Sequence, residues 1–215
     1  MRLVVFDLDG TLIDSIGDLA LAVNQLLAER GGAALETDAV ARMVGEGAGR
    51  LVARALAAAG IAGDARDAVP RFLELYDAIL PGRTRPYDGV CDVLEALRPR
   101  AQLAVLTNKP AEASAKILDT LGLSPFFGEV IGGDGPFPRK PAPEGLLHLV
   151  GRAGVDPHDA VLVGDSTIDL LTAHAAGTVA CIARYGFGRL TFDAACLRGT
   201  ELFARTPRDL LKLLE

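Results

Sequence analysis

Two carboxylates lie close together near the start of the chain, directly after a short apolar segment. Asp7 and Asp9 follow the apolar residues 4–6, and Gly10 and Thr11 come next. Carboxylates this close repel each other unless they share a cation or one of them is protonated. The string DLDGT therefore indicates a cation-binding or catalytic site, with an ordinary Asp–Gly turn as the structural alternative.

Polar side chains also follow three later apolar segments. They are Thr107 and Asn108 after LAVL, Lys140 in the loop after EVI, and Asp165, Ser166 and Asp169 after AVLVG. In an open parallel sheet, sites form beyond the carboxyl ends of the strands, so we expect these side chains to meet Asp7 at one edge. Taken alone, each has a structural alternative as a helix cap or a solvated loop residue. Their recurrence after successive strands favours a shared site.

The types of these side chains indicate a divalent metal and a phosphate. Carboxylate oxygens without clustered histidine or cysteine suit a hard cation, most simply Mg²⁺, and three residues offer them: Asp7, Asp9 and Asp165. Phosphate oxygens suit the backbone at Gly10 and the side chains of Thr11, Thr107, Asn108 and Lys140. One carboxylate can also attack phosphorus while a neighbouring one carries the proton.

Strand and helix patterns alternate along most of the chain. Short apolar runs, most of them rich in valine or isoleucine, predict strands at 3–6, 103–106, 130–131, 160–163 and 179–182. Helical patterns lie between them, with expected caps at Asp88, Ser166 and Thr206 and a glycine stop at Gly122. The alternation predicts an α/β fold with a Rossmann-like parallel sheet and helices on both faces.

One segment departs from this alternation, because residues 15–81 contain no convincing strand. Apolar residues recur at helical spacing from 16 to 30, where Ser15 with Asp18 resembles a capping box. Three further helical segments follow. We expect an inserted all-helical cap at 15–82 and a catalytic core at 1–14 and 83–215, with the glycine-containing string VGEGAGR in the cap able to bend toward the core.

Composition limits the possible partners. The chain has 215 residues, half of them hydrophobic, and a formal net charge of −6, so we expect no nucleic-acid partner. No stretch is long enough to span a membrane, and the first strand leaves no room for a signal peptide. The cysteines and histidines are scattered, which predicts a reduced, cytoplasmic protein without a zinc site: Cys91, Cys181, Cys196, His148, His158 and His174.

Four strings resemble, in order, the motifs of the haloacid dehalogenase superfamily of phosphohydrolases: DLDGT, LTNK, RKPAPE and GDSTID. The helical insert after the first motif resembles the small cap of one subgroup. The resemblance implies that Asp7 is the nucleophile and that Asp9 protonates the leaving oxygen and then activates water. It implies that Mg²⁺ is held by Asp7, by the backbone carbonyl of Asp9 and by Asp165.

The same resemblance assigns the remaining motif residues. Thr107 and Lys140 would bind phosphoryl oxygens, and Asn108 and the backbone amide of Gly10 would assist. Asp169 and Ser166 would support the metal site from behind. The intermediate would be an aspartyl-phosphate on Asp7, and the enzyme would be a phosphoric monoester hydrolase acting on a small phosphorylated metabolite, as a monomer or a homodimer.

Within the superfamily, RPYDGV, LTNKP and RYGFG resemble strings of bacterial phosphoglycolate phosphatases. This resemblance implies 2-phosphoglycolate as the substrate. Three cap arginines are candidates for binding its carboxylate, with surface positions on a helix as the structural alternative: Arg50, Arg42 and Arg54. Arg50 is favoured because it lies beside the flexible cap string. Another sugar or sugar-acid phosphate, such as N-acetylmuramate 6-phosphate, is a second possibility. A phosphoglucomutase-type transferase is a third, which Thr11 disfavours. A binding module without catalysis is disfavoured because no motif residue is missing.

Overall fold

A six-stranded parallel sheet, in the order β5-β4-β1-β6-β7-β8, forms the centre of the structure, a computed structural model that describes residues 1–215. The strands are β1 (Leu3–Phe6), β4 (Gln102–Leu106), β5 (Glu129–Ile131), β6 (Ala160–Gly164), β7 (Val179–Ala183) and β8 (Leu202–Ala204). The predicted fold class is confirmed, and all five predicted strands are present. Strand β8 was not predicted, because its residues Leu-Phe-Ala lack the valine or isoleucine that marks the other strands.

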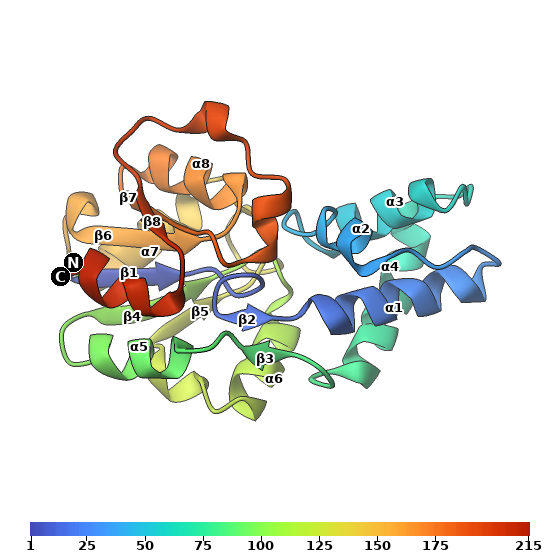
Figure 1. The fold of residues 1–215 in the computed structure, drawn as a ribbon, viewed down its shortest axis with the longest axis horizontal. Coiled ribbons are helices and arrows are strands. Elements are labelled where there is room, and N and C mark those ends of the chain that lie inside the picture. The colour runs from blue at the N-terminus through green and yellow to red at the C-terminus, as the bar shows by residue number, and fades with distance from the viewer.

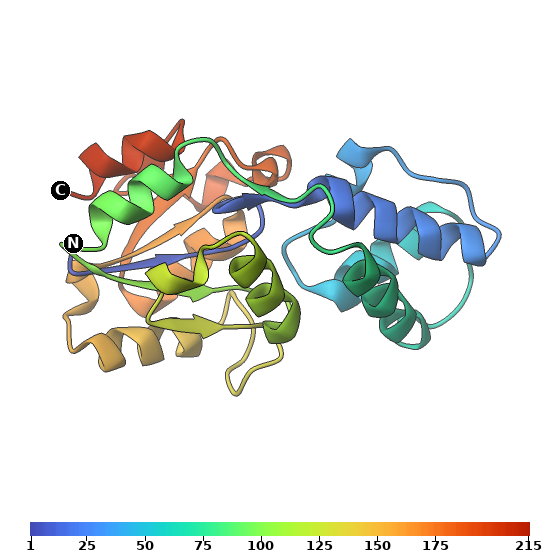
Figure 2. The same cartoon turned by 90° about the horizontal axis from the view of Figure 1, so that it is seen from below.

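Helices cover both faces of the sheet (Figure 2). The residues of β1 are buried on both sides, with Val4 and Phe6 in one apolar cluster and Leu3 and Val5 in another. The first cluster includes α5 (Val90–Leu97), α6 (Ala111–Thr120) and α9 (Leu210–Leu213), and the second includes α7 (Glu144–Ala153) and α8 (Thr167–Ala176). Short 3-10 turns connect the elements at Ser124–Phe126, Pro157–Asp159, Phe187–Leu190, Ala194–Cys196 and Pro207–Asp209.

The segment without predicted strands forms a separate helical lobe (Figure 1). Its helices are α1 (Ile16–Glu29), α2 (Thr37–Ala41), α3 (Ala48–Ala58) and α4 (Ala65–Ile79). The lobe lies beyond the carboxyl ends of the strands, and both chain termini lie at the opposite end of the molecule. We refer to it as the cap. None of the helices combines the length and the apolar character that crossing a bilayer requires.

Two short strands join the cap to the core. β2 (Ile13–Asp14) and β3 (Arg85–Pro86) pair in antiparallel fashion, so the outgoing and returning chains lie side by side. The buried carboxylate of Asp18 fastens this junction, because it accepts hydrogen bonds from the Thr84 amide and hydroxyl at 3.0 and 2.7 Å. Two residues per strand are too few to give a sequence signal.

The helix caps were predicted with mixed success. Ser166 and Thr206 are helix caps, as expected, and each forms a capping box with the aspartate three residues later. The capping box at Ser15 was wrong, since Ser15 makes no cap hydrogen bond and donates to Asp9 instead. The cap at Asp88 was also wrong: Gly89 occupies that position and Asp88 pairs with Arg208. In both cases a partner outside the helix takes the side chain that local rules assign to the helix.

Candidate active site

The polar residues predicted to share one edge of the sheet do converge there. Asp7 follows β1, Thr107 and Asn108 follow β4, and Asp165 follows β6. All of them line a cavity of about 50 Å³ between this edge and the cap. On the cap side the wall is mostly apolar and includes Leu19, Val44, Leu51, Phe72 and Tyr76. Several water molecules or one small substrate group would fill such a space.

One buried lysine, Lys140, lies between two aspartates of the core, and we call this group the Lys140 centre. Its ammonium nitrogen is 2.9 Å from an oxygen of Asp7 and 2.5 Å from an oxygen of Asp169. Ser166 donates through its hydroxyl and its amide to the other oxygen of Asp169. Burial raises the pKa of Asp7 to about 6 even though Lys140 opposes this shift. The Asp7 carboxylate is thus held in place in an environment that disfavours its charge.

The same region concentrates negative charge. Carboxylate oxygens of Asp7, Asp165 and Asp169 lie within 4.8 Å of one another. Burial, together with the charges of Asp169 and Asp7, raises the pKa of Asp165 well above its ordinary value. A divalent cation would relieve this repulsion, and the oxygen donors suit a hard metal. The residues therefore fit a divalent metal, with Asp7 and Asp165 as side-chain ligands, because Asp169 is already engaged by Lys140 and Ser166.

Two glycines make room for the Asp165 carboxylate. Gly10 has a φ of +83°, and a Cβ at that position would lie 1.9 Å from an Asp165 oxygen. Gly188 donates its amide to the same oxygen at 2.7 Å, and a Cβ there would also overlap the carboxylate. The glycines of DLDGT and RYGFG therefore have one purpose in common, the close enclosure of Asp165.

A second buried lysine, Lys109, holds the other aspartate of the first motif, and we call this group the Lys109 centre. Its ammonium nitrogen lies 3.0 and 3.1 Å from the two oxygens of Asp9 and 2.6 Å from the hydroxyl oxygen of Tyr76. The Ser15 hydroxyl donates to Asp9 at 2.5 Å. Burial raises the pKa of Tyr76 to about 12, so its phenol stays neutral at physiological pH. The side chains of Asp7 and Asp9 consequently have different surroundings.

Sequence reasoning missed two members of this centre. Lys109 follows β4 beside Thr107 and Asn108, so its position after a strand was a usable signal. Tyr76 gave no signal, because it occupies an apolar position on a helix where any aromatic residue would pack. Its role becomes visible only through the contact with Lys109.

The remaining predicted residues of the core are buried beside these centres. Thr107 accepts a 3.3 Å hydrogen bond from the Lys109 amide. Asn108 donates to the backbone oxygens of Gly45 in the cap and of Lys140, while its own side-chain oxygen has no protein partner. The hydroxyl of Thr11 is also buried without a partner. Thr107 and Asn108 face the cavity, whereas Thr11 is not among its lining residues.

The structure does not bring the cap arginines into the cavity. The side chain of Arg50 is 70% exposed and lies 3.6 Å from Glu46, which also pairs with Arg54. Arg42 donates to the backbone oxygen of Leu190 on the core. No arginine is among the residues that line the cavity, and the cationic residue among them is Lys109.

This fold, with its cap and its acidic cluster at the strand ends, defines a class of hydrolases. The sequence model of the haloacid dehalogenase-like hydrolase family matches residues 1–177. The chain belongs to this family, as the four motifs suggested.

Individual proteins that are similar to this chain indicate a more specific enzyme class within the family. A phosphoglycolate phosphatase from Rhodospirillum rubrum is 43% identical, over 87% of this chain and 81% of that protein. One from Aquifex aeolicus is 35% identical, over 100% and 97%. A crystal structure of a predicted phosphoglycolate phosphatase from Haemophilus somnus superposes with a TM-score of 0.92 at 31% identity, covering 100% of this chain and 98% of that one. The predicted enzyme class, a phosphoric monoester hydrolase, agrees with these relatives.

Proposed function

We propose that this protein is a Mg²⁺-dependent phosphatase of a small phosphorylated metabolite, with 2-phosphoglycolate as the leading substrate. The observation that carries the proposal is the buried Asp7 carboxylate, held by Lys140 beside Asp165 and facing a cavity closed by the cap. A nucleophile, cationic groups for phosphoryl oxygens and a site for a metal are thereby combined at one point.

In the proposed reaction, a carboxylate oxygen of Asp7 attacks phosphorus and the ester P–O bond breaks, which gives an aspartyl-phosphate. Asp9 donates a proton to the leaving oxygen. It then takes a proton from water as this water attacks the phosphorus, which releases phosphate and restores the Asp7 carboxylate.

The surrounding residues stabilise the charge on the transferring group. Lys140 and Thr107 bind phosphoryl oxygens, with support from Asn108, Thr11 and the amide of Gly10. Bound Mg²⁺, held by Asp7, Asp165 and the backbone carbonyl of Asp9, would neutralise charge between the carboxylates and the phosphoryl oxygens. Ser166 holds Asp169, and Asp169 holds the Lys140 ammonium group next to Asp7.

The size of the cavity supports a small leaving group. The cavity between the cap and the core has a volume of about 50 Å³, and the names of the similar proteins indicate phosphoglycolate. We propose residues 15–82 as the cap and 1–14 with 83–215 as the core of a cytoplasmic monomer or homodimer, which size-exclusion chromatography with fractionation would test.

The decisive experiment measures phosphate release from a panel of esters, in Mg²⁺ and in EDTA. The panel contains 2-phosphoglycolate, N-acetylmuramate 6-phosphate and glucose 1-phosphate. We expect release from 2-phosphoglycolate in Mg²⁺, its loss in EDTA, and a phosphorylated Asp7 peptide by mass spectrometry after a rapid quench. The Asp7→Asn variant should lose at least about 10³-fold in kcat.

Three results would contradict the proposal. Equal release with and without metal would remove the metal requirement, and undiminished release by Asp7→Asn would remove the nucleophile. Isomerisation of glucose phosphate without net phosphate release would indicate a phosphoryl transferase instead.

A further inference from the structure

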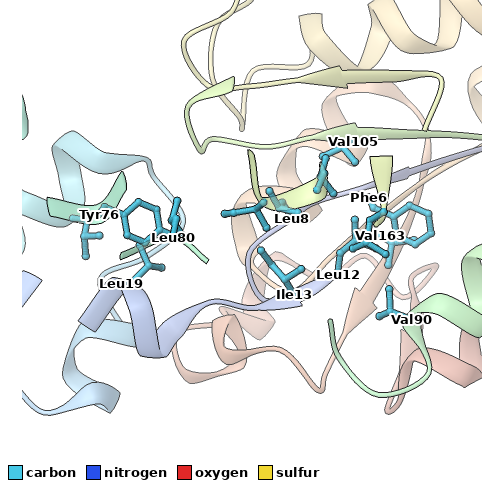
Figure 3. Packing of buried hydrophobic residues seen from close by; sticks show 14 of the residues in the cluster. Phe6, Leu8, Leu12, Ile13, Leu19, Tyr76, Leu80, Val90, Val105 and Val163 are labelled. Atoms are coloured by element: carbon cyan, nitrogen blue, oxygen red, sulfur yellow. The ribbon is translucent and has the colours of Figure 1, made fainter. Parts of the chain in front are cut away.

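Tyr76 is a cap residue that reaches the core through a buried ammonium group. It lies on the buried face of α4 with Ala68 and Phe72, and its ring stacks on Phe72 at a centroid distance of 5.9 Å. Figure 3 shows Tyr76 next to Leu19 and Leu80, at the junction of cap and core. A phenylalanine would satisfy this packing, so the hydroxyl requires a separate explanation.

The hydroxyl completes the hydrogen bonding of Lys109. The ammonium group has three N–H donors, and its contacts are the two oxygens of Asp9 and the hydroxyl oxygen of Tyr76. The nitrogen also lies 4.5 Å from the centre of the Tyr76 ring, within the range of a cation–π interaction. Since the Lys109 side chain is only 4% exposed, loss of the hydroxyl leaves a buried donor without a partner.

The three residues come together only across the boundary between the two lobes. Asp9 and Lys109 follow β1 and β4 of the core, whereas Tyr76 is near the end of α4. Lys116 of α6 also contacts α4, at Asp77, but this pair lies on the surface. Tyr76 is thus the cap side chain that contacts the Lys109 ammonium on Asp9.

We propose that Tyr76 is a positioning residue that, through Lys109, fixes the orientation of the Asp9 carboxyl group, which in its protonated form gives the proton to the leaving-group oxygen. The contact exists only while the cap lies against the core, so proton transfer to the leaving group depends on cap closure. This inference rests on the proposed acid–base role of Asp9.

The test compares leaving groups in the Tyr76→Phe variant, which keeps the ring and removes the hydroxyl. An alkyl ester such as 2-phosphoglycolate needs a proton on its leaving oxygen, whereas p-nitrophenyl phosphate releases a stable anion. We compare kcat/KM, because it reports formation of the aspartyl-phosphate and not its later hydrolysis. We expect kcat/KM to fall about tenfold for 2-phosphoglycolate and to change less than about twofold for p-nitrophenyl phosphate. A merely structural role would lower both by the same factor.

Two companion variants separate the possible results. Asp77→Asn removes the charge of the neighbouring surface contact of α4 with Lys116 and should leave both substrates unaffected. Asp9→Asn should show the same preference for the aryl ester as Tyr76→Phe, with a larger loss. If Asp9→Asn lowers kcat/KM equally for both esters, Asp9 does not protonate the leaving group and this inference fails with it. If Asp9→Asn discriminates but Tyr76→Phe does not, or if Asp77→Asn reproduces Tyr76→Phe, only this inference is overturned.

A double-mutant cycle gives a second check. In a Lys109→Met background the Tyr76 hydroxyl has no ammonium to hold, so adding Tyr76→Phe should cause no further loss with 2-phosphoglycolate. Fully additive losses would show that Tyr76 does not act through Lys109. Melting temperatures of the variants confirm that each is folded before kinetics are compared.

Discussion

The Lys140 centre and the Lys109 centre both pair a buried lysine with an aspartate of the first motif, but they differ in which lobe supplies the other partner. Each buries an ammonium group against an aspartate of the first motif, Asp7 in one case and Asp9 in the other. The partners of Lys140 all belong to the core, since its second carboxylate is Asp169 on α8. Lys109 instead combines Asp9 of the core with Tyr76 of the cap. The proposed nucleophile is therefore held by core residues alone, whereas the proposed proton carrier is also held, through Lys109, by a residue of the cap.

This difference suggests how one site performs two kinds of step. Attack on phosphorus needs a nucleophile whose position does not vary, and a packed core supplies it. Protonation of the leaving group is useful only once the substrate is enclosed. Asp9 is held directly by Ser15 at the start of the cap and, through Lys109, by Tyr76 near its end. Proton transfer from Asp9 is thereby made to depend on closure of the cap over the substrate.

Replacing Lys140 should cause the largest loss. Lys140→Met leaves the buried carboxylates of Asp7 and Asp169 without their cation, and we expect kcat to fall about 10²- to 10³-fold with alkyl and aryl esters alike. The metal-free protein should also lose about 3–5 kcal/mol of unfolding free energy. Steady-state kinetics and thermal melts measure both, with Lys116→Met as the control for an exposed lysine. A loss confined to alkyl esters would erase the distinction between the two centres.

Replacing Lys109 should have a smaller and more selective effect. Lys109→Met removes the cation from Asp9 but leaves Asp7 and Lys140 in place, so we expect about a 10- to 100-fold lower kcat/KM with 2-phosphoglycolate. With p-nitrophenyl phosphate the loss in kcat/KM should stay below about fivefold. The ratio of the two kcat/KM values is the measurement. Equal losses for both esters would mean that Lys109 serves the phosphoryl group rather than the leaving group.

Glu201 is a buried charged residue that belongs to neither centre. Replacing it should therefore change stability without changing catalysis. Burial alone would raise the pKa of Glu201, but amide donors, among them those of Arg198 and Gly199, and the His174 ring hold it at about 2. Its folded pKa lies below the usual 4.5, so its stabilisation is complete above about 4.5 and is lost as pH falls toward 2.

Glu201→Gln should accordingly lower the melting temperature at pH 7, with kcat unchanged, and the difference from the wild type should shrink below pH 4.5. Parallel melts from pH 7 to pH 3 measure it. A gap that is constant across this range would contradict the assignment, and a change in kcat would show that the remote pair is coupled to the site.

The smallest effect should come from Arg50. Its side chain points into solvent beside Glu46 and no cap arginine lines the cavity, so Arg50→Ala should change kcat/KM for 2-phosphoglycolate less than about threefold. Competition between 2-phosphoglycolate and inorganic phosphate would reveal any weaker role. A large rise in KM would mean that Arg50 swings inward when substrate is bound.

Residues after strands were predictable, because a strand end fixes where its next side chains lie. Asp7, Thr107, Lys140 and Asp165 follow from that rule together with the order of the motifs. Tyr76 and the partners of Ser15 and Asp18 were not predictable. The contacts of Tyr76 and Asp18 join segments far apart in the chain, and that of Ser15 leaves its helix for Asp9. Local rules assign the same side chains to helix packing or to helix caps. The cap side of the cavity consists of residues from several helices, so the sequence alone could not place Arg50 relative to it.

The pairing of β2 with β3 indicates that the cap can be inserted into the core or removed from it as a unit, both in evolution and by design. Asp14 lies opposite Arg85, so the chain leaves the core and returns to it at adjacent points. A segment whose two ends lie side by side can be gained, exchanged or deleted with little disturbance of its host. A short turn from Asp14 to Arg85 would close the core without changing the order of its strands. Specificity could then be altered by transplanting lobes, while the phosphoryl chemistry stays with the sheet.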